Sequence, residues 1–369
     1  SGGSKQVVTE IPIAIIPNTV AQLFIVSSLY SSLKITQQLP NLKSFESLLR
    51  TVNDDTFASI ALELFQIQAQ ANAVYRSFLD ARGIAPSSVR NVSDIPFLPI
   101  SFFKTTRVVT GEWQPEQVFT SSGTTGSITS SHYVQSLAFY LEHATRLFER
   151  AFGSPTNYHL LALLPGYGER EGSSLLAMVE HLIRQTKSPF SGYYLRNQVD
   201  LLRQVDRVRQ LNDGRTVLIW GVTFSLLELA EQHAPNLADC LIIETGGMKG
   251  RRPELTRAEL HEVLRTAFGV RQVASEYGMT ELLSQAYSGG EGRFAVPPCM
   301  KIQIRDINDP KAVVSAGKTG LIQVIDLANI HSCAFIETED LGLLSQDGYF
   351  QVLGRMDNSD ARGCNLLVG

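Results

Sequence analysis

The middle of the chain, from Tyr158 to Glu276, alternates short apolar runs with longer stretches in which apolar residues recur at helical spacing. Parallel strands need crossover helices between them, so this alternation predicts an α/β protein with a mostly parallel sheet flanked by helices. The expected strands are Tyr158–Leu164, Thr216–Gly221, Cys240–Thr245 and Gln272–Glu276. The expected helices are His132–Phe152, Ser173–Gln185, Gln198–Leu211, Phe224–Gln232 and Arg257–Phe268.

The sequence on either side of this block has its own periodicity. Apolar residues at helical spacing predict a helix within Asp55–Arg82, whereas a period of two after Pro297 predicts short strands. These late strands are Lys301–Ile304, Leu321–Ile325, Cys333–Ile336 and Phe350–Leu353. We therefore expect one domain over residues 5–353, with a small β-rich lobe at 298–353 and a hinge-like tail at 354–369.

Composition narrows the possible partners. A net charge of -4 over 369 residues, with no basic stripe, argues against nucleic acid. The four cysteines show neither a disulfide nor a zinc pattern, which favours the cytoplasm. The apolar segment Ile11–Leu33 could belong to a signal peptide, but Pro12, Pro17 and Asn18 interrupt it. We expect buried helix or strand segments there and no integral membrane span.

A loop rich in hydroxyl groups and glycine follows Phe119 and extends to Gly126. Its backbone N–H groups and hydroxyls can surround phosphate oxygens, because glycine lets the main chain approach closely. No Gly-Lys-Ser/Thr ends the loop, so it is not a Walker A motif. Taken alone, the run is equally consistent with an ordinary surface loop.

A second motif, Glu276–Glu281, follows an expected strand, and ligands of open α/β sheets gather at the carboxyl ends of strands. The ring of Tyr277 could stack on a base, and the Thr280 hydroxyl could reach a phosphate. The Glu281 carboxylate could help to hold Mg²⁺. As an isolated segment, the motif could also be purely structural.

Two motifs near the end, Glu337–Gly342 and Gly354–Asp357, supply an acid and an arginine suited to ribose hydroxyls. In this order, the motifs from about Ile95 to Gly369 resemble the adenylate-forming superfamily of acyl-CoA synthetases, phenylacetate-CoA ligases and peptide-synthetase adenylation domains. The resemblance implies an AMP-forming ligase that uses ATP and Mg²⁺. It implies a phosphate loop at Ser121, Ser122, Gly123, Thr124, Thr125 and Gly126. It also implies adenine contacts at Gly246, Gly247, Tyr277 and Gly278, and ribose contacts at Asp340 and Arg355. Thr280 and Glu281 are implied to be catalytic, and Glu281 is implied to bind magnesium.

Within that superfamily the details are similar to the acyl-protein synthetase, or LuxE-type, family. The match rests on Asp94–Lys104, Leu164–Ser174 and Gly354–Cys364. It implies a fatty acid substrate, a thioester on Cys364, and an acyl-accepting partner such as an acyl reductase or a carrier protein. An acyl- or aryl-CoA ligase and a non-catalytic nucleotide-binding subunit remain as alternatives.

Two features depart from the wider superfamily. Its phosphate loop usually closes with Pro-Lys, but Gly126 is followed by Ser127, so a cation beside the phosphates is missing. We also expect no full C-terminal lid domain with a catalytic lysine, an ending that the acyl-protein synthetases share. A further glycine-rich segment, Gly166–Gly172, lies where a dinucleotide-binding turn would, although its third glycine falls one residue late.

Overall fold

The computed structural model describes residues 42–122, 128–165, 171–195, 197–246, 255–309 and 312–356, which all belong to one compact unit. The strands in these ranges are β1 (Leu98–Pro99), β2 (Gln117–Thr120), β3 (Ser131–Val134), β4 (Tyr158–Leu163), β5 (Gly192–Tyr193), β6 (Thr216–Val222), β7 (Leu241–Thr245), β8 (Ala274–Tyr277), β9 (Ala286–Ser288), β10 (Phe294–Ala295), β11 (Met300–Arg305), β12 (Thr319–Asp326), β13 (Phe335–Leu344) and β14 (Tyr349–Arg355). The α-helices are α2 (Lys43–Leu48), α3 (Asp54–Ala71), α4 (Ala73–Ala81), α5 (Phe102–Thr105), α6 (Leu137–Phe152), α7 (Ser174–Gln185), α8 (Gln198–Leu211), α9 (Thr223–His233) and α10 (Arg257–Phe268). Short 3₁₀ turns lie at Pro86–Ser88, Val92–Asp94 and Pro155–Asn157.

Within the described residues, 12 strands form one sheet in the order β11-β12-β13-β14-β10-β9-β8-β7-β6-β4-β5, with β1 paired to β13, while β2 and β3 form a separate pair. Strands β5, β4, β6, β7 and β8 are parallel, whereas β8 to β14 pair in antiparallel fashion. The α/β class is confirmed, but the prediction of a mostly parallel sheet is wrong for the sheet as a whole. The strands after Pro297 continue the same sheet through β10 and β14.

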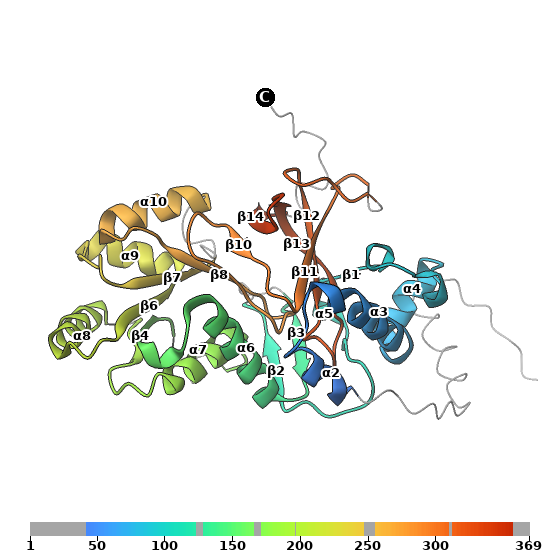
Figure 1. Cartoon of the computed structure of the whole chain (residues 1–369), viewed down its shortest axis with the longest axis horizontal. Helices are drawn as coiled ribbons and strands as arrows, with labels where there is room; N and C mark the ends of the chain where they lie inside the picture. Colours follow the sequence, from blue (N-terminus) through green and yellow to red (C-terminus); the bar gives the residue numbers. More distant parts are fainter. Residues whose placement is uncertain are drawn as a thin grey trace, which may run out of the picture. The chain divides into compact units, whose positions relative to one another are not determined.

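Helices cover both faces of the parallel strands (Figure 1). Side chains alternate between the faces of a strand, so Leu160 and Ala162 of β4 join the apolar cluster that contains α6 and α7. Leu161 and Leu163 face the other way and join the cluster that contains α8, α9 and α10. Strand β4 is therefore buried on both faces, as its continuous apolar sequence indicates.

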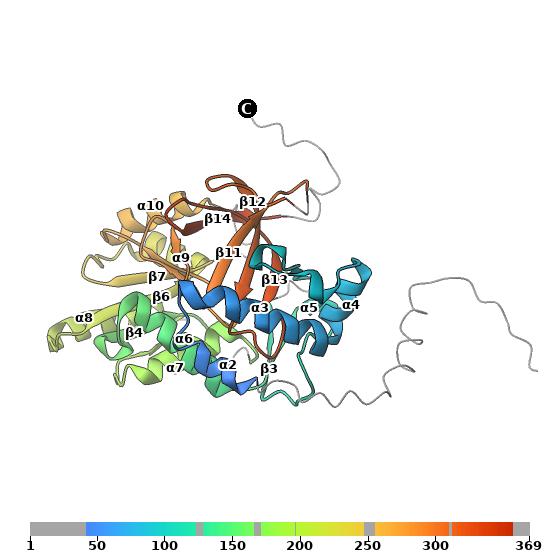
Figure 2. The ribbon, with the colours of Figure 1, turned by 45° about the vertical axis from the view of Figure 1, so that its right-hand side comes forward.

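Helix α3 packs across the strands of the C-terminal half (Figure 2). The rings of Phe65 and Phe335 meet edge to face, with their centroids 5.9 Å apart. Gln68 is fully buried between the helix and the turn that precedes β13. Its Oε1 accepts a hydrogen bond from the Ala334 N–H at 2.9 Å, and its Nε2 donates to the Asn329 carbonyl at 2.9 Å. These bonds attach the N-terminal helices to the sheet.

Two predicted helices differ from the structure. The helix predicted from His132 begins at Leu137, because residues 131–134 form β3 and pair with β2, and Ser136 caps the helix through the Phe139 N–H. The helix predicted within Asp55–Arg82 is interrupted at Asn72. The Asn72 side chain caps α4 and donates a hydrogen bond to the Ser332 carbonyl at 2.9 Å, a distant partner that local periodicity does not reveal.

None of the helices in the described part of the chain combines the length and apolarity needed to cross a bilayer. The apolar segment Ile11–Leu33 and the tail beyond Met356 lie outside the described residues. Strand β14 continues through residues 353 and 354 to Arg355, and the proposed bounds of 5–353 and 354–369 stay predictions.

Candidate functional site

A cleft of about 480 Å³ opens at the carboxyl ends of β6, β7 and β8. Val222 ends β6, Thr245 ends β7, and Glu276 lies one residue before the end of β8, and all three line the cleft. The other lining residues come from α5, the β2–β3 pair, α6, α7, the segment after β8 and β14. The cleft therefore lies where α/β sheets bind ligands.

Most of the described residues that the sequence assigned to the nucleotide site meet in this cleft. The lining includes Ser121, Ser122, Gly246, Gly278, Thr280, Glu281 and Arg355. Tyr277 and Asp340 are not among the lining residues. Gly123, Thr124, Thr125, Gly126, Gly247 and Cys364 lie outside the described residues. The individual roles of all these residues stay predictions.

The segment that carries Thr280 and Glu281 is fixed by buried hydrogen bonds to its backbone. The Thr280 carbonyl accepts a bond from Nδ1 of His132 at 2.8 Å, and the Glu281 carbonyl accepts one from Nδ2 of Asn329 at 2.8 Å. Burial lowers the pKa of His132 to about 4, so its ring is neutral and Nε2 accepts a bond from the Ser332 hydroxyl. The two cleft residues are therefore held on a rigid support.

Asp326 fixes the backbone of the two residues Leu283 and Ser284, which follow shortly after Glu281. One of its oxygens, Oδ2, accepts the backbone N–H groups of Leu283 and Ser284, each at 2.9 Å. The other, Oδ1, accepts the Ala328 N–H at 3.0 Å and the Ser284 hydroxyl at 2.6 Å. Burial raises the pKa of Asp326, and these donors oppose the rise.

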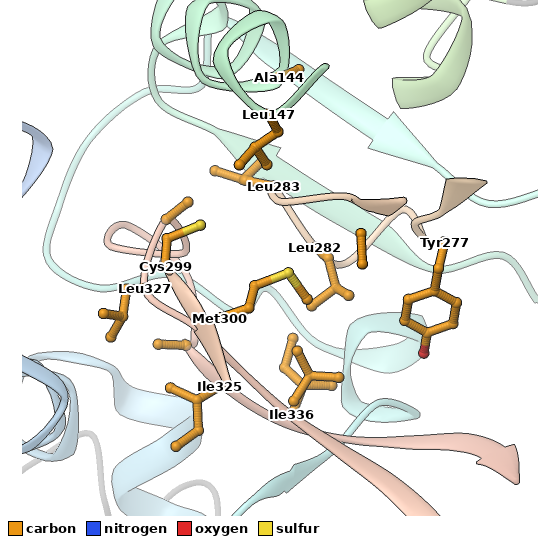
Figure 3. Close-up of a cluster of buried hydrophobic side chains, with 14 of the residues drawn as sticks. Ala144, Leu147, Tyr277, Leu282, Leu283, Cys299, Met300, Ile325, Leu327 and Ile336 are labelled. Carbon is orange, nitrogen blue, oxygen red and sulfur yellow. The ribbon is translucent and has the colours of Figure 1, made fainter. Parts of the chain in front are cut away.

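Apolar side chains surround the same segment. Leu282 lies beside Met300 and Ile336, whereas Leu283 lies next to Leu147, and Cys299 and Leu327 lie at the edge of the cluster (Figure 3). Each of these side chains is nearly inaccessible to solvent. Hydrogen bonds in such surroundings do not compete with water, so the segment keeps one conformation.

Glu281 is a buried carboxyl group, with 5% of its surface exposed, that lines the cleft. Burial raises its pKa, and a hydrogen bond from Ser130 opposes the rise. It forms no ion pair with another described residue. The charge of Arg355 also opposes the rise, but a buried carboxylate without an ion pair to a described residue fits Mg²⁺, which commonly uses one or two protein carboxylates and takes its other ligands from phosphates and water. In the described part of the chain, no three His, Cys, Asp or Glu side chains gather around a common point suited to a metal ion.

Tyr277 packs away from the cleft. Its ring lies 5.3 Å from that of Phe350 and 5.8 Å from that of Phe294, measured between centroids. Its hydroxyl donates a hydrogen bond to Oδ2 of Asp340 at 2.9 Å. Burial raises the pKa of both groups, while the nearby Arg355 charge lowers the pKa of Asp340. Stacking of Tyr277 on adenine stays a prediction.

Asp340 and Arg355 are brought together by the pairing of β13 with β14, in which they are direct partners. Nε of Arg355 lies 3.8 Å from Oδ1 of Asp340, and Nη2 lies 3.7 Å from Glu339. Lys104 lies 3.6 Å from the same Glu339 and also lines the cleft. Among the described lining residues, Lys104 and Arg355 are the two cations, and the resemblance to known families did not assign a role to Lys104.

Glu276 is a second buried carboxyl group in the cleft, also 5% exposed. Burial raises its pKa to about 7; a hydrogen bond from Thr245 and the charge of Arg257 oppose this rise, and the charge of Glu244 adds to it. Glu244 itself lies 2.7 Å from Nη1 of Arg257. Burial works to raise the pKa of Glu244, but hydrogen bonds from His261 and Ser275 and the charge of Arg257 outweigh it and lower that pKa.

Sequence reasoning missed Lys104, Ser130, Glu276 and Gln285 as lining residues. Lys104 and Glu276 stand inside motifs quoted for the resemblance, so their positions offered a signal that was not used. Ser130 and Gln285 stand in segments without such a signal. Only the pairing of β2 with β3 and the turn before β9 bring them to the cleft.

No family model matches the chain. The long-chain-fatty-acid–luciferin-component ligase of Aliivibrio fischeri is 22% identical to it over 341 residues, which cover 83% of this chain and 86% of that protein. The chain is a distant homologue of that ligase.

Solved structures show the same fold. The open conformation of 2-hydroxyisobutyryl-CoA ligase, in complex with 2-HIB-AMP and CoA, matches with a TM-score of 0.62 at 15% identity, over 87% of this chain and 76% of that one. The same ligase in its postadenylation state with 2-HIB-AMP matches with a TM-score of 0.61 at 14% identity, over 87% and 69% of the two chains. The chain has the fold of the adenylate-forming ligases.

Proposed function

We propose that this protein activates a carboxylic acid, fatty or other, with ATP to acyl-AMP and then passes the acyl group to a protein thiol. The observation that carries the proposal is the meeting of Ser121, Ser122, Thr280, Glu281 and Arg355 in one cleft at the carboxyl ends of parallel strands. These are hydroxyl, carboxylate and guanidinium groups, which suit phosphate oxygens, a metal ion and a polyanion. The distant homology to a fatty-acid ligase supports the same activity.

In the first half-reaction, an oxygen of the substrate carboxylate forms a bond to the α-phosphorus of ATP. The bond from that phosphorus to the bridging oxygen breaks, and pyrophosphate leaves with the electron pair. The Thr280 hydroxyl and the Arg355 guanidinium would donate hydrogen bonds to phosphate oxygens as charge develops there. Both stand on strand ends or on the rigid segment after β8, so little reorganisation is needed.

Glu281 would hold Mg²⁺, which, when bound, neutralises charge on the phosphates. Its burial suits this role, because a dry site strengthens the attraction between carboxylate and cation. Lys104 would supply a positive charge on the phosphate side, where the loop lacks the usual lysine.

In the second half-reaction, a thiolate attacks the acyl carbonyl carbon and AMP leaves with the electrons of the broken C–O bond. The described cysteines are poorly suited to this step, because burial raises the pKa of Cys240, Cys299 and Cys333 to about 12 each. The proposal therefore assigns the thioester to Cys364. An acyl reductase or carrier protein would then accept the acyl group.

Coenzyme A is the second candidate acceptor. The similar solved ligase contains CoA. The three described cysteines are buried or partly buried, so if Cys364 does not react, the acyl acceptor would have to be a thiol from outside the protein. An acyl-CoA ligase shares the first half-reaction, so only the fate of the acyl group separates the two activities.

The first test is acid-dependent exchange of labelled pyrophosphate into ATP, measured over a panel of fatty, short-chain and aromatic acids. We expect exchange with at least one acid. ATP binding without exchange for any acid would contradict the proposal and favour a non-catalytic nucleotide-binding subunit.

The second test separates the acceptors. Cys364→Ser and Cys240→Ser proteins are incubated with ATP and labelled acid, and hydroxylamine-sensitive label on the protein is measured beside exchange. We expect Cys364→Ser to keep exchange and lose the label, and Cys240→Ser to keep both. Label that persists in Cys364→Ser, or label that appears only on added CoA, would refute the assignment of Cys364.

A further inference from the structure

One wall of the cleft combines apolar side chains with buried hydrogen-bond acceptors. This inner wall consists of Tyr140, Leu175, Met178, Val222, Glu276 and Gln285. Glu276 and Tyr277 are consecutive in β8, so their side chains point to opposite faces of the strand. The inner wall therefore lies on the other face of β8 from Tyr277, while Gly246 and Gly278, which were also assigned to the nucleotide, mark its border. On the proposed function, it is the place for the carbon skeleton of the acid.

Three donor groups around the inner wall are already used within the protein. Nε1 of Trp220 donates to the Thr245 hydroxyl at 2.7 Å, and that hydroxyl bonds to Glu276. The Tyr140 hydroxyl donates to the Ser174 carbonyl at 3.0 Å. Nε2 of Gln285 donates to the Leu283 carbonyl at 3.3 Å.

One acceptor on this wall has no hydrogen-bond partner, and a carboxyl group beside it has no ion-pair partner among the described residues. Oε1 of Gln285 is buried and has no hydrogen-bond partner, although the residue is only 4% exposed. Glu276 is equally buried, and no described cation forms an ion pair with it, since Arg257 pairs with Glu244. Buried acceptors of this kind are normally satisfied, so an unpaired one at a cleft points to a group that arrives with a ligand.

The Glu276 carboxyl group and the Gln285 side chain both lie against Gly278, which makes room for them. A Cβ placed at Gly278 would lie 2.2 Å from Oε1 of Glu276 and 3.4 Å from Cγ of Gln285. Both side chains therefore reach the same point on the inner wall. Any residue with a side chain at this position would have to push the Glu276 carboxyl aside.

We infer that the preferred acid carries a hydrogen-bond donor, a hydroxyl or a protonated amine, on its carbon skeleton, and that Glu276 and Gln285 accept it. A plain alkyl chain would bury both acceptors without partners, whereas a donor would satisfy them among apolar walls. A site built in this way discriminates strongly against the analogue that lacks the donor. The raised pKa of Glu276 fits this reading, because an arriving ammonium group would stabilise its ionised form.

The inference rests on the proposed function and is tested by the same exchange reaction with matched acids. Unsubstituted alkanoates of several chain lengths are compared with the hydroxy and amino derivatives of each, substituted at successive carbons. We expect at least one donor-bearing acid to exceed its parent alkanoate by roughly 100-fold in kcat/KM. The hydroxyl and amine series show which donor the wall accepts.

Variants assign the preference to the two residues. Glu276→Gln should reduce the preference for an amine at least roughly 10-fold, because it removes the negative charge and keeps the shape. Gln285→Met, which keeps length and loses the acceptor, should reduce the preference for either donor by a similar factor. Glu262→Gln, on the exposed side of α10, is the matched control and should leave the ratio unchanged. The ratio between two acids does not depend on the fraction of folded protein, so a purely structural effect leaves it constant.

The outcomes are distinct. If alkanoates exchange as well as or better than every substituted acid, or if both variants keep the wild-type ratio, the inference is overturned while the proposed function stands. If no acid supports exchange, the proposed function fails and the inference fails with it.

Discussion

Replacing Glu276 by glutamine tests the electrostatics of the cleft through the stability of the protein. Glu276 is 5% exposed, and burial, the largest effect, raises its pKa from 4.5 to about 7. A carboxyl group with a raised pKa binds its proton more tightly in the folded than in the unfolded chain. The contribution of Glu276 to the free energy of unfolding is therefore most favourable below about pH 4.5. It declines as the pH rises to about 7 and stays low above that pH.

The magnitude follows from the shift. At about 1.4 kcal/mol per pKa unit, a rise from 4.5 to about 7 corresponds to about 3 kcal/mol of lost stability once the pH exceeds 7. Glutamine has the same size, accepts the bond from Thr245 and never ionises. Glu276→Gln should thus match the wild type at about pH 4 and be more stable by about 3 kcal/mol at about pH 8.5.

The assay is urea unfolding of both proteins at the two pH values. The difference in the free energy of unfolding between the two proteins at low pH is subtracted from the same difference at high pH. Other buried acids, such as Glu281 and Asp326, contribute equally to both proteins and cancel. Glu262→Gln serves as the exposed control, for which we expect no pH-dependent difference. A double difference below about 1 kcal/mol, or one of opposite sign, would show that the ionised Glu276 carries no penalty in the folded protein.

Three further predictions concern the cleft and its support. Glu281→Gln and Thr280→Ala should each lower pyrophosphate exchange about 100-fold or more while circular dichroism stays unchanged, and near-normal exchange in both would make the segment structural only. Lys104→Ala should raise the apparent KM for ATP about 10-fold, whereas the exposed control Lys318→Ala should leave it unchanged. Equal effects of the two substitutions would show that Lys104 does not contact the phosphates. Asp326→Asn should cost about 1–3 kcal/mol in urea unfolding, because the amide cannot accept all four bonds that Asp326 receives; an unchanged unfolding midpoint would contradict this.

Helices with signals at both ends were predictable from the sequence. Helix α10 begins after Thr256, which forms a capping box with Glu259, and ends at Gly269, whose φ of 68° suits glycine. Helix α8 likewise has Asn197 as its cap, and its predicted bounds are confirmed. In both helices, the information that sets the ends lies within a few residues of the helix itself.

Elements that depend on distant partners were not predictable in the same way. Residues 131–134 continue the helical pattern of α6, but they form β3 because β2 offers a hydrogen-bonding edge. The mixed sheet has the same origin, since the pairings of β8 with β9, β9 with β10 and β10 with β14 join the two halves in the described part of the chain. The order of the motifs in the sequence predicted that Ser121, Thr280 and Arg355 would lie in one site. No motif in the sequence near Gln285 indicated that this residue would line the same cleft.

The alternation of side chains along β8 gives the cleft two ends with opposite requirements. Tyr277 leads to Asp340 and Arg355, where hydroxyl and guanidinium donors face acidic groups. Glu276 leads to Gln285, where the protein supplies acceptors and its own donors are already used. On the proposed function, a polyanionic nucleotide would be attracted to Arg355 and Lys104, which offset Asp340 and Glu339 at the first end, and repelled by the ionised form of Glu276 at the second. On the proposed function, the same strand would orient the two substrates by charge, with their reacting groups meeting beside Thr280, which lines the cleft.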